Sequence, residues 1–161
     1  MKRLTALVLV LVLMISAVPV SAEETVKVVV NGSMVFFDQP PVIIDGRTLV
    51  PVRAVAEKLG AFVSWNGETQ TVSVSLDQIG VALAVGNKNM AVTNLGTNQL
   101  AYVAELDVPP QNINGRTLLP IRPVVEAFGC SVAWDGATST VLIYTGDYDP
   151  AKARTTIVIG E

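Results

Sequence analysis

Two short segments of the chain place apolar side chains at the spacing of an amphipathic helix. The spacing i, i+3, i+4, i+7 is typical of one buried helix face. It is met by Val52, Val55, Ala56 and Leu59, and again by Ile121, Val124, Val125 and Phe128. Pro51 and Pro120 stand where each helix begins, a position at which a missing N–H costs little. Gly60 and Gly129 follow as left-handed C-terminal caps. Pro123 is tolerable only near a helix start, so we expect the second helix to begin slightly later than the first.

A strand pattern with a period of two follows each helix. Val63 and Trp65 share one face of a strand, as do Val132 and Trp134. Asn66-Gly67 and Asp135-Gly136 mark turns into return strands. In the second return strand, Leu142 and Tyr144 make the other face apolar as well. We therefore expect that strand to be covered on both sides or to form a contact surface.

Further strands are predicted before each helix. Residues 26–30 and 34–37 form a hairpin around Asn31-Gly32, and residues 81–85 open the second half. The second half has 14 more residues here, and two extra strands are predicted at 90–93 and 100–106 around the turn at 94–98. Residues 156–160 resemble a third opening strand, which we expect to pair with the sheet of the second half.

The two halves are copies of one another. Residues 37–74 align with 106–143 without a gap, and 19 of the 38 aligned pairs are identical. This is the signature of a tandem duplication. We predict an α+β fold of two related units, residues 23–77 and 78–146, each an antiparallel sheet packed on a single helix, with a tail at 147–161. Because such units bury little surface alone, they could share a core, so that residues 23–161 form one compact domain.

The first 22 residues have the pattern of a secretory signal. Lys2 and Arg3 precede the uncharged apolar residues 4–17, and Val20-Ser21-Ala22 has the small residues of a cleavage site. A membrane anchor is the alternative, but the apolar run is short of the roughly 20 residues that span a bilayer. We expect cleavage after Ala22, a secreted or cell-envelope protein, and no membrane association afterwards.

Composition excludes several classes of function. The full chain has a net charge of −3, and without Lys2 and Arg3 the remaining 9 basic and 14 acidic residues give −5. An acidic chain without a basic cluster is poorly suited to nucleic acid. The absence of histidine excludes imidazole metal sites and Ser-His-Asp or Cys-His catalysis. The single cysteine, Cys130, cannot form an internal disulfide and is interpreted as a small buried residue.

The repeated charged residues admit a structural and a functional interpretation. Arg53 with Glu57, and Arg122 with Glu126, lie four apart on the helices, as exposed salt bridges do; the alternative is a charged pair that binds a ligand. Arg47 and Arg116 each follow a turn glycine. We favour an internal contact, with backbone carbonyls or with a carboxylate such as Asp38 or Asp107, which would lock the Pro-Pro segment in place; the alternative is an anionic ligand.

The aromatic and acidic residues provide the other candidates. The alternation of Trp65 with Val63, and of Trp134 with Val132, favours tryptophans on the core face. If Trp65, Trp134 or Tyr102 were instead exposed in a groove, a sugar- or peptide-binding role would be favoured. Asp38 with Glu57, or their copies, are the only repeated carboxylates, and a carboxylate-based hydrolase is a remote alternative that requires them to converge in a cleft.

The combined motif resembles a known family. Each half reads Asp-x-Pro-Pro, then Asn/Asp-Gly-Arg-Thr-Leu-x-Pro-x-Arg, then a helix ending in Gly, then Val-x-Trp-Asn/Asp-Gly. This pattern is similar to the copper amine oxidase N-terminal-like, or stalk, domain of secreted proteins from Gram-positive bacteria, here in two tandem copies. The resemblance implies a curved antiparallel sheet around one helix. It implies no oxidase activity, no copper and no other cofactor.

These observations predict a secreted, non-enzymatic stalk or interaction module of the cell envelope or extracellular space. Its partner would be a protein or a cell-wall component. The alternative is a module that binds cell-wall polysaccharide or peptide. In this interpretation the repeated residues have structural roles. Arg47 and Arg116 are the two for which a ligand-binding role is most open.

Overall fold

A computed structural model describes residues 25–146, and residues 1–24 and 147–161 lie outside that description. The signal segment at 1–22 and the closing strand expected at 156–160 fall in the undescribed part. Of the described residues, 52% are in strands and 12% in two helices, and the strands form three sheets. The prediction of an α+β fold with one sheet on one helix in each unit is therefore wrong, because the protein is mostly β.

The elements of each half follow the repeat. The first half contains β1 (Lys27–Val30), β2 (Ser33–Val35), β3 (Val42–Ile44), β4 (Arg47–Pro51), α2 (Val52–Leu59), β5 (Phe62–Asn66) and β6 (Thr71–Leu76). The second contains β7 (Ile79–Ala84), β8 (Asn89–Asn94), β9 (Gln99–Glu105), β10 (Gln111–Ile113), β11 (Arg116–Pro120), α3 (Ile121–Ala127), β12 (Ser131–Asp135) and β13 (Thr140–Tyr144).

The central sheet joins the two halves. Its order is β10-β11-β4-β3, so β4 of the first half pairs antiparallel with β11 of the second. Val50 lies opposite Leu119, which is its own counterpart 69 residues further along the chain. Leu49 and Pro51 lie opposite Pro120 and Leu118, so the pairing is symmetric about the Val50–Leu119 pair. A pseudo-two-fold axis therefore relates the halves at this point.

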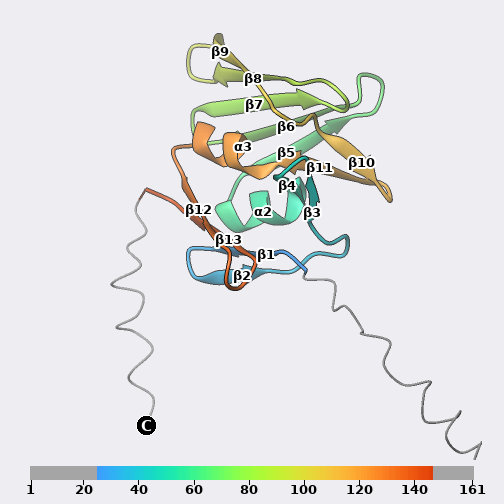
Figure 1. The fold of residues 1–161 in the computed structure, drawn as a ribbon. Helices are drawn as coiled ribbons and strands as arrows, with labels where there is room; N and C mark the ends of the chain where they lie inside the picture. Colours follow the sequence, from blue (N-terminus) through green and yellow to red (C-terminus); the bar gives the residue numbers. More distant parts are fainter. Residues whose placement is uncertain (1–24, 147–161) are drawn as a thin grey trace, which may run out of the picture.

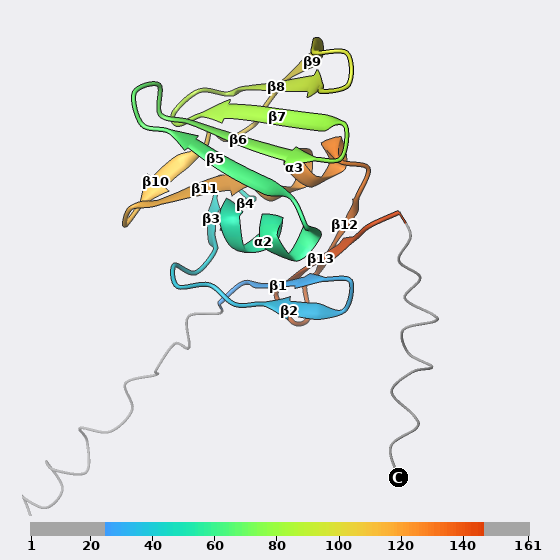
Figure 2. The same cartoon turned by 180° about the vertical axis from the view of Figure 1, so that it is seen from behind.

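The two outer sheets also combine strands from both halves. The first outer sheet has the order β12-β13-β1-β2, and the second outer sheet has the order β5-β6-β7-β8-β9. The hairpin that ends each half thus pairs with the strands that open the other half. Figure 1 and Figure 2 show the helices lying between these two sheets.

Each helix is buried on two sides, which explains why a separate sheet-on-helix unit does not form. In α2, Val55 packs into the cluster beneath the first outer sheet, whereas Val52 and Ala56 pack into the cluster beneath the second. In α3, Val125 and Val124 divide in the same way. A helix of seven or eight residues buries too little against one sheet, and packing against two increases the apolar area removed from water.

Among residues 25–146, three clusters make up the core. Val28, Val30, Val141 and Ile143 dominate the cluster of the first outer sheet, together with Val50. Val72, Val74, Val81, Leu83, Met90 and Val92 dominate that of the second, together with Leu119. Leu49, Val108 and Leu118 form a small third cluster in the central sheet.

Cys130 belongs to the first cluster and is 6% exposed. Burial raises the pKa of its thiol, as expected of a structural cysteine.

The helix boundaries follow the sequence signals with one exception. Gly60 and Gly129 have φ of 73° and 77°, the left-handed conformation that ends a helix. Pro51 and Pro120 complete β4 and β11, and each helix begins at the next residue. The expected later start of the second helix is wrong. Pro123 is the third residue of α3, within the first turn, where no N–H is needed for a helical hydrogen bond.

Strand direction shows which strand is additional in the second half. β1 runs parallel to β13, whereas β7 runs antiparallel to β6, to which a tight turn connects it. β8 runs in the same direction as β6, just as β1 runs in the same direction as β13, and β9 leads into a Pro-Pro segment as β2 does. The β8–β9 hairpin therefore corresponds to β1–β2. The additional strand is therefore β7. The strands predicted at 90–93 and 100–106 are present as β8 and β9.

Candidate functional site

A groove lies where the two halves meet on one side of the molecule. Its volume is about 460 Å3. The first half lines it with α2 and the β5–β6 hairpin, and the second half lines it with β10 and the start of β11. Among its lining residues are Asp38, Pro51, Arg53, Glu57, Trp65, Asn112, Arg116 and Thr117. The aliphatic residues Val52, Ala54, Val63 and Val72 also line it, so the groove combines charged and polar groups with apolar surface and one aromatic ring.

Trp65 is the largest side chain in the groove, and it is 42% exposed. It faces inward from β5 beside the buried Val72, so the alternation in the sequence assigned its face correctly. Because it stands next to the end of the strand, its ring is only partly covered. Trp134 occupies the same position in β12 and is 45% exposed. The prediction that both rings lie in the core is therefore wrong.

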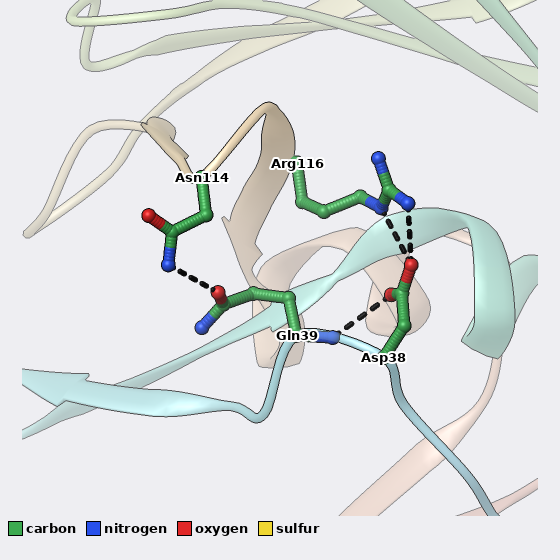
Figure 3. A network of polar contacts seen from close by, with 4 residues as sticks. All are labelled: Asp38, Gln39, Asn114 and Arg116. Atoms are coloured by element: carbon green, nitrogen blue, oxygen red, sulfur yellow. Dashed lines mark hydrogen bonds and ion pairs between the residues drawn. The ribbon is translucent and has the colours of Figure 1, made fainter.

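An ion pair between the halves forms one wall of the groove. Arg116 Nε donates a hydrogen bond of 2.8 Å to Asp38 Oδ2, and its Nη2 contacts the same oxygen (Figure 3). The backbone N–H of Gln39 donates to Asp38 Oδ1 at 2.8 Å. Asn114 Nδ2 donates to the side-chain oxygen of Gln39 at 2.8 Å. The segment before the Pro-Pro pair of the first half is thereby tied to the β10–β11 turn of the second.

The reciprocal ion pair joins Arg47 to Asp107. Arg47 Nε donates to Asp107 Oδ2 at 2.6 Å. Each arginine therefore binds the aspartate of the other half, and the pairing spans 60 or 78 residues of sequence. The Gln39–Asn114 contact has no equivalent on this side, because Val108 and Asp45 occupy those positions in the repeat. Val108 is buried in the third core cluster instead.

The helix arginines differ between the halves. Arg122 Nη1 donates to the Val132 carbonyl at 3.2 Å and lies 3.5 Å from Glu126. Within the described part of the chain, Arg53 and Glu57 form no such ion pair, although both line the groove. Arg122 is thus held by its own half, whereas Arg53 and Glu57 are exposed residues that line the groove.

The remaining residues selected from the sequence lie elsewhere. Leu142 and Tyr144 are half-buried on the outer face of the first outer sheet, where Leu142 lies opposite Val29. Tyr102 is exposed on β9 and does not line the groove. Gly60 and Gly129 end the helices, as described above. Asn112 and Thr117, which do line it, were not selected from the sequence, because local patterns do not show that β10 and β11 lie beside α2 of the first half.

Chemistry by carboxylates has little support from this geometry. Asp38 and Glu57 line the same groove. However, the hydrogen bond from Arg116 holds the pKa of the Asp38 carboxyl below its ordinary value of 3.8, with a smaller contribution from the Gln39 amide. A general acid needs the opposite shift.

Residues 25–146 contain no cluster of acidic, cysteine or histidine side chains able to hold a metal ion. None of the helices described is long and apolar enough to cross a membrane.

Comparison with protein families gives a match to the copper amine oxidase N-terminal domain over residues 29–143. The match covers most of the chain, so the protein belongs to this family, as the motif in the sequence indicated. It runs through both halves as a single copy, whereas the sequence resemblance predicted two tandem copies. The domain of this family is a non-catalytic module.

The chain is also similar to a protein from Brevibacillus choshinensis that is called a protease inhibitor. It is 28% identical to this chain over 142 residues, which cover 87% of this chain and 41% of that protein. The chain thus spans less than half the length of this relative.

The Asp38–Arg116 pair gives a pH-dependent prediction. Because the pKa of Asp38 is lowered by folding, the pair stabilises the protein above the ordinary pKa of 3.8, and this contribution is lost as the pH falls through the folded-state pKa. The D38N variant should be less stable than the wild type at neutral pH, and the difference should shrink in acid. Urea unfolding across a pH series measures it. The E68Q variant, which changes an exposed turn residue, is the control. A D38N difference that did not vary with pH would contradict the assignment.

Proposed function

We propose that this protein is a non-catalytic binding module of the cell envelope or extracellular space, and that it takes its ligand in the Trp65 groove. The family supports the non-catalytic role, since its domain is a non-catalytic module. The groove supports binding, and its half-exposed tryptophan is the observation that carries the proposal. The extracellular location rests on the sequence of residues 1–22 alone.

The lining of the groove favours a ligand with both an apolar or ring face and polar groups. An exposed indole provides a flat surface for a sugar ring or a peptide side chain. Arg53 and Glu57 provide a donor and an acceptor on α2, and Asn112 adds an amide from the other half. A volume of about 460 Å3 matches a small segment of a polymer rather than a whole macromolecule. Cell-wall polysaccharide and peptide both meet these requirements.

Exchange of the groove tryptophan tests the proposal, and the repeat supplies its own control. The W65A variant should lose retention on purified cell wall, or weaken binding of soluble wall fragments by about fivefold or more, since a stacked ring contributes on the order of 1 kcal/mol or more. Binding is measured by co-sedimentation with wall and by titration calorimetry with fragments. W134A removes the equivalent ring from the other half and should bind as the wild type does.

Three sets of fragments identify the ligand class: glycan chains, peptides, and wall material treated to remove each. Retention lost only after glycan digestion identifies a sugar ligand, and retention lost only after peptide digestion identifies a peptide. Equal effects of W65A and W134A, or no retention of the wild type, would contradict a specific role for this groove.

Protease inhibition is a second candidate function, supported by the name of the Brevibacillus choshinensis relative. It predicts stoichiometric inhibition of at least one enzyme in a panel of serine, cysteine and metalloproteases, measured as residual activity during titration with the purified chain. The W65A variant should be included, because retained inhibition would place the inhibitory surface outside the groove. Full protease activity at a large molar excess of the chain would argue against this candidate.

A further inference from the structure

One border of the Trp65 groove is the edge of a β-sheet. β5 is the outermost strand of the second outer sheet and pairs on one side only, with β6. Val63 and Trp65 of this strand line the groove. On its other side β5 contacts α2, and Figure 2 shows the strand next to that helix. The groove therefore lies along a strand edge as well as beside a helix.

The main-chain groups of Val63 and Trp65 point away from β6. Along an antiparallel edge strand, residues that bond to the neighbouring strand alternate with residues whose N–H and C=O face outward. The Ala61 N–H donates to the Ala56 carbonyl of α2, so Ala61 is on the outward side. Val63 and Trp65 follow it at the period of two. Within residues 25–146, their outward main-chain groups have no hydrogen-bond partner.

The equivalent edge in the other half is closed by an arginine. β12 is the outermost strand of the first outer sheet. The outward carbonyl of Val132 accepts a hydrogen bond from Arg122, whose Nη1 lies 3.5 Å from Glu126. Arg53 and Glu57 align with this arginine and glutamate in the repeat, but neither contact has an equivalent in the described first half. The edge of β5 is thus open where the edge of β12 is closed.

Smaller side chains leave space beside the open edge. Val52 and Ala54 of α2 line the groove, whereas Ile121 and Pro123 occupy the aligned positions of α3. The groove has a volume of about 460 Å3. An open strand edge with free space beside it is the arrangement in which proteins bind an extended peptide as an added strand.

We propose that the ligand of the Trp65 groove is an extended polypeptide segment that pairs with β5 as an additional strand. This proposal rests on the proposed function and selects peptide over polysaccharide. Val63 and Trp65 each offer one outward N–H and one outward C=O, two residues apart. The main chain of an extended peptide repeats its donors and acceptors at the same spacing, and a glycan chain does not.

The lining of the groove also defines the side chains of the ligand. In an added strand, alternate side chains point into the groove, and an apolar or aromatic one is favoured against the indole of Trp65. Asp38 and Arg116 are already paired with one another. Arg53 and Glu57 are left to complement an acidic and a basic side chain of the ligand. The expected ligand therefore has an apolar residue flanked by charges of both signs.

A segment of another polypeptide fits this site better than a second copy of the chain. The net charge of −3 opposes association of two copies. The groove itself is balanced, because its four charged lining residues are two arginines, one aspartate and one glutamate. It is also lined from both halves of the molecule, so it suits a single extended segment rather than a strand that brings a folded sheet with it.

Selection of peptides on the purified chain supplies the probe for the test. A displayed library of random heptapeptides should yield binders, and a synthetic form of a selected peptide is then titrated by calorimetry. V63P removes one outward N–H, at a position where an edge strand tolerates proline. It should weaken binding by about fivefold or more, because one hydrogen bond is lost. V132P makes the same change in β12 and should bind as the wild type does.

Two measurements on the wild type test the strand pairing without any variant. Methylation of the main-chain nitrogens of the peptide, one residue at a time, should weaken binding by about fivefold or more at alternate residues only. Addition of the peptide should slow hydrogen exchange at the amides of Val63 and Trp65. Exchange at Val132 and Trp134, which occupy the same positions in β12, should not change.

The failure of strand pairing is distinguishable from the failure of the groove as a binding site. Selection of no peptide, a methylation series without a period of two, or unchanged exchange at Val63 and Trp65 would each overturn strand pairing. If W65A alone still lost retention on cell wall, the proposed function would stand and the ligand would be a glycan or another group bound through side chains. Equal retention of W65A and W134A would instead overturn the groove itself.

Discussion

The pairing of β4 with β11 is the interaction on which the rest of the structure depends. It places Val50 opposite Leu119, its own counterpart in the repeat, and so defines the pseudo-two-fold axis. Both side chains are fully buried on the same face of the central sheet, and they belong to the two different core clusters beneath the outer sheets. Each helix begins immediately after its strand. The position of this strand pair therefore fixes where both helices lie and which face of each meets the outer sheets.

The exchange of hairpins between the halves explains why the candidate site lies at their boundary. Asp38 belongs to one half and Arg116 to the other, and their ion pair forms a wall of the groove. The two sides of the molecule differ at this boundary in residues that align in the repeat. One side has Gln39, Asn112 and Asn114; the other has Val108, Ile43 and Asp45. The amide residues make the first side polar, whereas Val108 adds to the core on the second. A scaffold with two similar halves can thus have a candidate site on one side only.

Local patterns in the sequence predicted the elements, but not how they combine. The helix faces, the glycine caps and most strands could be predicted because each depends on residues close together in the chain. The period of a strand shows which of its faces is buried, but it does not show which strand lies next to it. The pairing of the β5–β6 and β12–β13 hairpins with strands of the other half was therefore not predicted. The arginine motif gave two possible carboxylate partners, and the long-range pairing decided between them. Trp65 was misplaced because alternation does not show how far a strand extends beyond the core that covers it.

Interleaved sheets predict that the two halves unfold together, since neither outer sheet can lose the strands of one half and keep its core. Differential scanning calorimetry tests this most directly. A single transition is expected, with the calorimetric and van't Hoff enthalpies equal within error, so that their ratio is about 1. Two resolved transitions, or a ratio well above 1, would mean that the halves unfold separately, and would contradict the dependence of the fold on the β4–β11 pairing.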